Sequence, residues 1–371
     1  MYQKKKGDYH IAIGHEAMRG NTTGVRNIAI GRRTLYSNVT GSYNIGIGQE
    51  SLQFNTTGQY NVALGYEALK DNTTGQYNVG IGYRTLYENT TAVANVGIGF
   101  AVLENNTIGS YNVGVGYRAL KANTTGERNV GIGYEALEEN TTGRYNVAMG
   151  HQTLYSNTSG QFNTGIGYQS LFVNTIGQSN VAVGQQSLYV NTTGSNNVAI
   201  GSYACNANTT GQYNVGVGFQ ALNSSVTGQA NVAVGYKAMY SNTNGDQNVA
   251  IGYQALYSNT TADFNVAMGY FALEKNTTGQ YNVGIGYRAV RENTTGTQNV
   301  GVGFDALREN TTGFRNVAVG FGVLNSNKDK IKDSNTIQEN TQIDIRDKLT
   351  RNKILSDCFD NLDEKTLEGL D

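Results

Sequence analysis

The feature that most constrains this chain is a strict repeat of seventeen residues. Residues 61–65, Asn-Val-Ala-Leu-Gly, return at 78–82 as Asn-Val-Gly-Ile-Gly, and the pattern recurs from His10 to Asn316 without insertion or deletion. Seventeen residues are too few for two helices and a turn, but they suffice for one coil of a solenoid that pairs with the coils above and below. We therefore predict an all-β fold, a β-solenoid (parallel β-roll) of nineteen coils over residues 10–327, roughly 90 Å long at a strand spacing of ~4.8 Å.

Each position of the repeat, counted from the recurrent Asn as position 1, accepts a narrow set of residues. Positions 1 to 5 read Asn, Val or Ile, Ala or Gly, aliphatic, Gly. This predicts a short strand with Val and Ile at positions 2 and 4 filling the core and the small residues on the other face. Asn-Thr-Thr-Gly at positions 12 to 15 predicts a turn in which Gly supplies a positive φ. Positions 6 to 11 fit either a second strand with a bend or a single helical turn, and we favour the strand.

Position 3 holds Ala or Gly in all nineteen copies, although an exposed strand face would tolerate larger polar residues. Something must therefore pack closely against that face. Because the other face already carries Val, Ile and Leu, we predict that the small residues meet a partner chain, most simply in a homotrimer around a threefold axis. The alternative is a narrow single-chain solenoid whose own walls meet at position 3.

Composition narrows the partners and the compartment. The 371 residues carry a formal net charge of −1, so there is no electrostatic reason to expect a nucleic acid as partner. No segment reaches the ~20 apolar residues of a membrane-spanning helix, and residues 1–9 lack the apolar core of a secretory signal. We expect no membrane insertion, assembly in a cytoplasm unless a leader was removed, and no disulfide between the distant Cys205 and Cys358.

The repeat fixes no catalytic or metal-binding constellation. His10 replaces Asn at position 1, and His15 and His151 stand at position 6, where most copies have an aromatic residue. Acidic residues fall at variable positions, and each Gly-x-Gly belongs to a repeat strand rather than to a dinucleotide-binding loop. We therefore predict no enzymatic activity, no cofactor and no metal. The Asn-Thr-Thr triplets match the N-glycosylation pattern, but a turn explains them without glycans.

Two aromatic rows, at positions 6 and 17, form the candidate working surface. Stacked aromatic side chains can hold sugar rings or can simply stabilise a sheet face, and we favour structural stacking. The possible glycan-contact residues are Tyr66, Tyr83, Tyr117 and Tyr134 at position 6, and Tyr60, Tyr77, Tyr111 and Tyr145 at position 17.

Residues 58–68, Gly-Gln-Tyr-Asn-Val-Ala-Leu-Gly-Tyr-Glu-Ala, resemble the head repeats of trimeric autotransporter adhesins, which read Gly-x-Asn-Ser-Val-Ala-Ile-Gly-x-x-Ser/Ala. The repeats also resemble the Asn-Thr-Thr-Gly…Asn-Val-Ala-Ile-Gly arrays of phage tail-fibre-like proteins and of large DNA virus proteins. The resemblance implies a trimer of left-handed parallel β-rolls. This unit is longer than the adhesin unit by three residues around Leu69 and Lys70, and no secretion signal or membrane-anchor barrel is seen, which favours a viral or phage-type fibre.

After Asn327 the repeats stop and the sequence becomes charged. Apolar residues at helical spacing predict a short amphipathic helix over residues 343–362. This helix is expected either to cap the last coil, because an open sheet edge invites aggregation, or to form a short coiled coil. The predicted organisation is an N-terminal segment 1–9, a solenoid 10–327 and a charged C-terminal segment 328–371.

These patterns predict a non-enzymatic structural fibre or adhesin-type protein that projects a repetitive surface for attachment, exposed on a virion or cell surface. Its expected partners are its own copies in a homotrimer and a cell-surface glycan or receptor. The alternative function is a ligand-binding β-solenoid. Within that alternative, glycan binding is preferred to ice binding, because the two adjacent Thr residues of each turn cannot both point outward.

Overall fold

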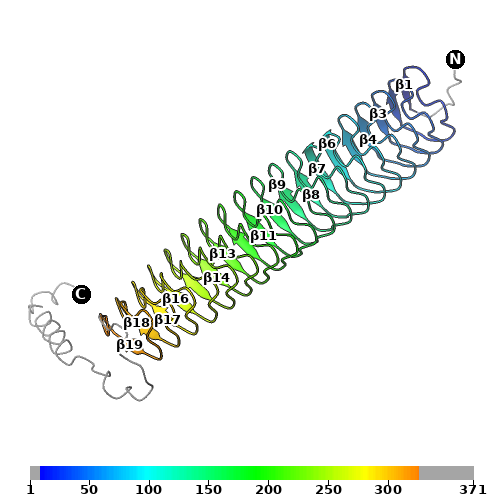
Figure 1. The fold of residues 1–371 in the computed structure, drawn as a ribbon. Coiled ribbons are helices and arrows are strands. Elements are labelled where there is room, and N and C mark those ends of the chain that lie inside the picture. The colour runs from blue at the N-terminus through cyan, green and yellow to red at the C-terminus, as the bar shows by residue number, and fades with distance from the viewer. Residues whose placement is uncertain (1–8, 326–371) are drawn as a thin grey trace, which may run out of the picture. The chain divides into compact units, whose positions relative to one another are not determined.

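The computed structural model describes residues 9–325, which form the predicted all-β solenoid. Nineteen strands, each beginning 17 residues after the last, stack in parallel along the coils (Figure 1). Each strand residue pairs with the residue at the same repeat position in the neighbouring strand, as Val62 does with Val79. The strands are β1 (Ile11–Ile13), β2 (Ile28–Ile30), β3 (Ile45–Ile47), β4 (Val62–Leu64), β5 (Val79–Ile81), β6 (Val96–Phe100), β7 (Val113–Tyr117), β8 (Val130–Ile132), β9 (Val147–Met149), β10 (Thr164–Ile166), β11 (Val181–Val183), β12 (Val198–Ile200), β13 (Val215–Val217), β14 (Val232–Val234), β15 (Val249–Ile251), β16 (Val266–Met268), β17 (Val283–Ile285), β18 (Val300–Val302) and β19 (Val317–Val319). The predicted helix over 343–362 and its segment 328–371 lie outside the described residues.

The two faces of the strands are the reverse of the prediction. Ala63 and Ala148 at position 3 are fully buried, whereas Leu64 and Ile98 at position 4 are 41% and 39% exposed. The core is built from position 3, the small residue at position 8 and the Leu at position 9. The expectation that Val and Ile at positions 2 and 4 fill the core is therefore wrong. A coil this narrow holds one large apolar side chain, and position 9 supplies it.

Close packing within one chain accounts for the small residue at position 3. The side chain at position 8 of each coil points toward position 3 of the next. A Cβ added to Gly97 would lie 2.6 Å from Thr85 Cγ2, and one added to Gly114 would lie 2.5 Å from Val102 Cγ1. Two further pairs follow the same size rule, Thr34 with Gly46 and Thr153 with Gly165. The contact that suggested a partner chain is thus made by the solenoid's own walls, as the alternative held.

Positions 6 to 11 form a series of turns, not the favoured strand and not a helical turn. In the coil that begins at Asn61, φ is +54° at Glu67 and +52° at Leu69. The backbone N–H of Glu67 donates to the carbonyl of Gln49 in the preceding coil (2.9 Å), and that of Leu69 donates to Thr85 in the following coil (3.0 Å). A left-handed non-glycine residue costs roughly 1–2 kcal/mol. Hydrogen bonds to both neighbouring coils hold this backbone in place.

Two buried columns of asparagine run through the coils. At position 12, Asn72 Nδ2 donates to Asn55 Oδ1 of the preceding coil (2.7 Å) and to the carbonyl of Gly75 (3.1 Å). At position 1, the backbone N–H of Asn78 donates to Asn61 Oδ1 (3.0 Å). Gly75 does not have the positive φ predicted for position 15. Glycine stands there because a Cβ would lie 2.3 Å from Asn72 Oδ1.

Candidate interaction surface

The aromatic row at position 6 forms two continuous stacks on the outside of the coils. Neighbouring ring centroids are 4.8–5.3 Å apart in the first stack, which runs from Tyr66 to Tyr168. The second stack runs from Phe219 to Phe321. Gln185 and Ser202 separate them. The predicted residues of this row all belong to the first stack and are exposed: Tyr66, Tyr83, Tyr117 and Tyr134.

The row at position 17 is exposed as well but is interrupted. Tyr60 stacks on Tyr77 with ring centroids 5.1 Å apart and planes 1° from parallel. Tyr145 stacks on Phe162. Tyr111 has no stacked neighbour in this row, and the Arg128 guanidinium lies 5.5 Å from its ring centroid instead. The structure therefore brings the eight predicted tyrosines to the surface as two separate rows, each following the coils.

Ring spacing decides what these rows can bind. Rings about 5 Å apart leave no room for a sugar between them, and sugars stack on ring faces rather than edges. Inside each stack, both faces of a ring are covered by its neighbours, so ring edges and phenol oxygens point outward. This geometry supports the stacking interpretation. Glycan contact stays a prediction, confined to those edges and hydroxyls or to the terminal ring of a stack.

A third aromatic row, at position 10, was missed by the sequence reasoning. Phe172 stacks between Tyr155 and Tyr189, with both centroid distances 5.3 Å. Beside this stack, Gln169 Nε2 donates to Gln152 Oε1 (2.9 Å) in a row of amides at position 7. Both features lie within residues 145–236, a stretch without any Asp, Glu, Lys or Arg. The recurrence of aromatic residues at a spacing of 17 was the signal that would have revealed the row.

The outer face of the sheet, formed by the side chains at positions 2 and 4, is apolar and open. In β6 and β7 the strand continues to position 6, whereas the other strands end at position 4, so the position-6 row borders this face. Eighteen steps along nineteen strands at ~4.8 Å, and about 7 Å across positions 2 to 4, give a planar area of about 600 Å². Monomeric proteins rarely expose an apolar patch of more than a few hundred Å². We refer to this surface as the apolar face.

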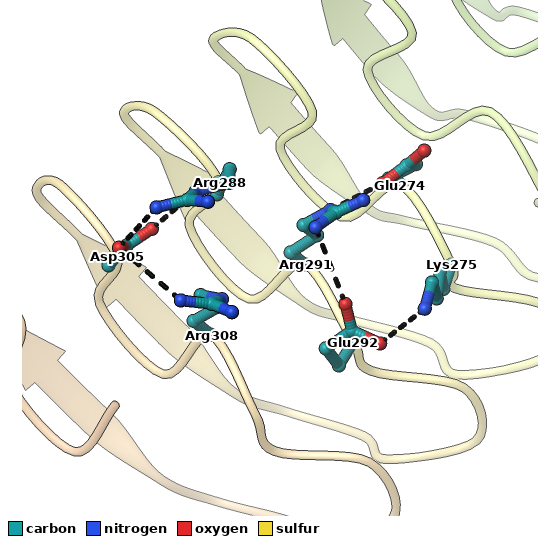
Figure 2. A network of polar contacts seen from close by, with 7 residues as sticks. All are labelled: Glu274, Lys275, Arg288, Arg291, Glu292, Asp305 and Arg308. Atoms are coloured by element: carbon teal, nitrogen blue, oxygen red, sulfur yellow. Dashed lines mark hydrogen bonds and ion pairs between the residues drawn. The ribbon is translucent and has the colours of Figure 1, made fainter. Parts of the chain in front are cut away.

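Charged side chains at positions 7, 10 and 11 form ion pairs beside the aromatic row at position 6, and the Arg288 guanidinium lies 4.7 Å from the Tyr287 ring centroid. In Figure 2, Asp305 accepts two hydrogen bonds from Arg288 of the preceding coil, at 2.8 and 2.7 Å, and lies 3.7 Å from Arg308. The hydrogen bond to Asp305 raises the pKa of the Arg288 guanidinium. Nearer the N-terminus, the hydrogen bond from Lys70 lowers the pKa of Glu50. Partly exposed pairs of this kind contribute little each; some, such as Arg288 with Asp305, join neighbouring coils, and others, such as Arg308 with Asp305, lie within one coil.

Chemically reactive groups are few among residues 9–325. No group of three or more His, Cys, Asp or Glu there is placed to hold a metal ion. Cys205 is buried, which raises the pKa of its thiol to about 12, so it is not a ready nucleophile. His10 Nδ1 faces the backbone N–H of Asn27 at 3.2 Å, as the asparagine it replaces would. No helix in this range is long and apolar enough to cross a membrane.

Most polar side chains of the turn are buried or make hydrogen bonds within the solenoid. Asn55, in one of the Asn-Thr-Thr triplets, is fully buried in the asparagine column, out of reach of a glycosylating enzyme. Thr56 Oγ1 donates to the carbonyl of Thr73 in the next coil (3.0 Å). In this turn the exposed threonine is Thr57, at position 14. The turn therefore offers one outward row of hydroxyls, whereas an ice-binding strand would offer two.

No protein-family model matches the sequence, and no curated protein matches it significantly. The resemblance to adhesin and tail-fibre repeats stays a prediction. Function is therefore inferred from the geometry of the coils and their surfaces.

Proposed function

We propose that this chain is a non-enzymatic structural fibre protein that projects a repetitive surface for attachment. The observation that carries the proposal is the unbroken hydrogen bonding of nineteen strands to their neighbours. The buried asparagine columns and the ring stacks repeat the same coil-to-coil connection. A rod whose neighbouring coils are hydrogen-bonded at every ~4.8 Å step resists bending and keeps its two ends apart. A spacer or a fibre shaft requires this stiffness.

Copies of the chain meet through the apolar face and form the homotrimer expected from the resemblance. This replaces position 3 as the contact, because position 3 is closed within each coil. The face spans about 600 Å² in plane, of the same order as the ~800 Å² per partner of a standard interface. Covering it would remove the half-exposed Val and Ile side chains from water, a favourable change of about 25 cal/mol per Å² of apolar surface.

The mass of the full-length protein in solution, measured by light scattering, tests the assembly. A trimer has three times 39.9 kDa, or about 120 kDa. Substituting both Ile98 and Ile200 of the apolar face by Glu is expected to yield folded monomers. The matched control carries Ile108→Glu and Ile176→Glu, which change exposed aliphatic residues of the position-14 row and are expected to leave the trimer intact. A wild-type monomer at micromolar concentration would contradict the assembly.

Attachment is tested separately, on a glycan array with the wild-type protein. If phenol oxygens contact the sugar, Tyr83→Phe and Tyr117→Phe are expected to weaken binding while leaving the ring stack and the melting temperature nearly unchanged. Tyr240→Phe and Tyr257→Phe, in the stacked pair at position 10, serve as the control. If the protein binds no glycan and no cell surface, the adhesin role is excluded and the role as a structural fibre remains.

The alternative function, a glycan-binding solenoid, has one specific observation in its favour. Within residues 145–236, which contain no Asp, Glu, Lys or Arg, planar amides at position 7 lie beside the aromatic stack at position 10. The nearest charge is at the N-terminal end of the row, where Gln152 Nε2 donates to Glu135 of the preceding coil (2.9 Å). Amides and aromatic edges are suitable contacts for uncharged sugars. Binding of neutral but not anionic glycans, abolished by Gln169→Glu, would favour this alternative over a fibre whose contacts lie elsewhere.

A further inference from the structure

The buried asparagine column at position 12 is interrupted at one place among residues 9–325, at Ser225. In regular coils the amide nitrogen makes two bonds. Asn259 Nδ2, for example, donates to Asn242 Oδ1 of the preceding coil (2.8 Å) and to the carbonyl of Ala262 (3.0 Å). Ser225 has no amide. It therefore cannot donate an N–H to Asn208 Oδ1 in the preceding coil, and it offers no amide oxygen to Asn242 Nδ2 in the following coil.

The consequences are visible on both sides of the interruption. Asn208 Oδ1, one coil earlier, is buried without a hydrogen-bond partner, and so is the Ser225 hydroxyl itself. One coil later, Asn242 Nδ2 donates to the carbonyl of Gly245 (2.9 Å), without the second, inter-coil bond that Asn259 makes. All three side chains are at most 1% exposed. Buried polar atoms in folded proteins nearly always have a partner, from protein or from ordered water.

The space at Ser225 is of the right kind for a small polar molecule. Replacing Asn by Ser removes two heavy atoms, Oδ1 and Nδ2, from a fully buried position. A Cβ added to Gly211 in a regular coil would lie 2.3 Å from Asn208 Oδ1, whereas one added to Gly228 would lie 3.0 Å from Ser225 Oγ and 3.0 Å from Asn242 Nδ2. Both atoms therefore face the space that the missing amide leaves. A buried water typically makes about three hydrogen bonds to groups that otherwise lack partners.

We infer that one ordered water molecule occupies this gap and completes the asparagine column. The water donates to Asn208 Oδ1, accepts from Asn242 Nδ2 and makes its third hydrogen bond with Ser225 Oγ. It stands where the amide of the missing asparagine would stand. The interior of the solenoid therefore contains a specific hydration site in a column that is otherwise made of protein amides alone.

A structure of the full-length protein at a resolution that shows ordered water tests this directly. The expected result is a density peak within hydrogen-bonding distance of Asn208 Oδ1, Ser225 Oγ and Asn242 Nδ2. Ser225→Asn is expected to remove the peak, restore the amide column and slow hydrogen exchange in the peptides that span residues 209–245. The matched variant Asn157→Ser, at position 12 of a regular coil, is expected to create a second peak and to speed exchange around it.

Two results would overturn the inference. The first is an empty gap, or one closed by a direct hydrogen bond between Ser225 Oγ and Asn208 Oδ1. The second is faster exchange in Ser225→Asn than in the wild type, which would mean that the gap has no room for an amide. Ser225→Ala provides a further measurement, because it removes one partner of the water without filling the gap. Its melting temperature is expected to fall below that of the wild type, and an unchanged or higher value would count against a hydrogen-bonded site.

Discussion

Replacing Asn129 by Leu tests whether the buried asparagine columns hold the coils together. Asn129 stands at position 1 and is fully buried. Its Oδ1 accepts the backbone N–H of Asn146 in the next coil (3.0 Å), and its Nδ2 donates to the carbonyl of Gly143 (2.8 Å). Leucine has a similar size and shape but no polar atoms, so the variant fills the space while removing these two hydrogen bonds and two longer ones (3.2 Å) with the side chains of Asn112 and Asn146.

The expected loss of stability follows from the groups left behind. The N–H of Asn146 would be buried without a partner, at a cost of about 1–3 kcal/mol. The carbonyl of Gly143 would lose one of its two donors and keep Asn140 Nδ2 (3.2 Å), at a further cost of about 1 kcal/mol, so the expected loss is about 2–4 kcal/mol. Gln169→Leu is the matched control. It also removes an amide from a coil-to-coil row, but its partners, Gln152 and Gln186, are partly exposed and can turn to water. Its expected cost is about 1 kcal/mol or less.

Two measurements separate the variants. Urea unfolding followed by circular dichroism gives the change in the free energy of unfolding. Native-state hydrogen exchange locates it, because a defect in a stacked array first opens the coils around it. Faster exchange is expected in the coils that contain Asn129 and Asn146. If Asn129→Leu costs no more than Gln169→Leu, the buried columns do not hold the coils together and the reasoning fails.

Three further outcomes follow from the same packing. Ala148→Phe, which overfills the closed position 3, is expected to destabilise the protein by about 1–3 kcal/mol or more. A thermal melt of the dissociated monomer should therefore show a lower melting temperature than that of the wild-type monomer. Deleting residues 180–196 keeps every coil in register, whereas deleting Gly184 alone turns core residues outward; the single deletion should give the lower melting temperature, and the opposite order would contradict stacked coils. Burial and the neighbouring Glu135 raise the pKa of the Glu138 carboxyl, so its contribution to stability is present at low pH and lost as the pH rises through that pKa. Glu138→Gln should therefore melt higher than wild type at neutral pH, and the gain should vanish in acid.

The repeat length and the turn residues were enough to predict a parallel solenoid, but not which strand face points inward. Alternation of large and small residues fits both orientations, and Val62 and Leu64 were assigned to the core because they are more apolar than Ala63. The sequence did contain a signal for the true orientation. Position 3 is Gly in each coil that follows Thr or Val at position 8, as with Gly97 after Thr85, and only side chains that touch need such a match in size.

The left-handed turns could not be predicted from residue type. Left-handed conformations are typical of Gly and Asn, yet Leu69 and Glu67 adopt them. Their conformation is imposed by hydrogen bonds to the coils on both sides, which single-residue preferences do not contain. Contacts between coils also explain why the sequence predicted which tyrosines form the aromatic rows but not whether those rows can bind a sugar. The coil spacing that brings Tyr117 and Tyr134 together also covers their ring faces.

The stability of a single coil does not explain why the apolar face is made almost entirely of Val and Ile at position 2. Position 2 holds Val or Ile in every copy except one, where Thr164 takes its place in β10. Thr164 pairs in register with both neighbouring strands, so the coil accepts a β-branched residue with a hydroxyl at this position. Threonine would suit the strand as well as valine and would expose less apolar surface. The recurrence of Val and Ile is what the proposed contact with a second copy of the chain would require, because that contact would remove these side chains from water.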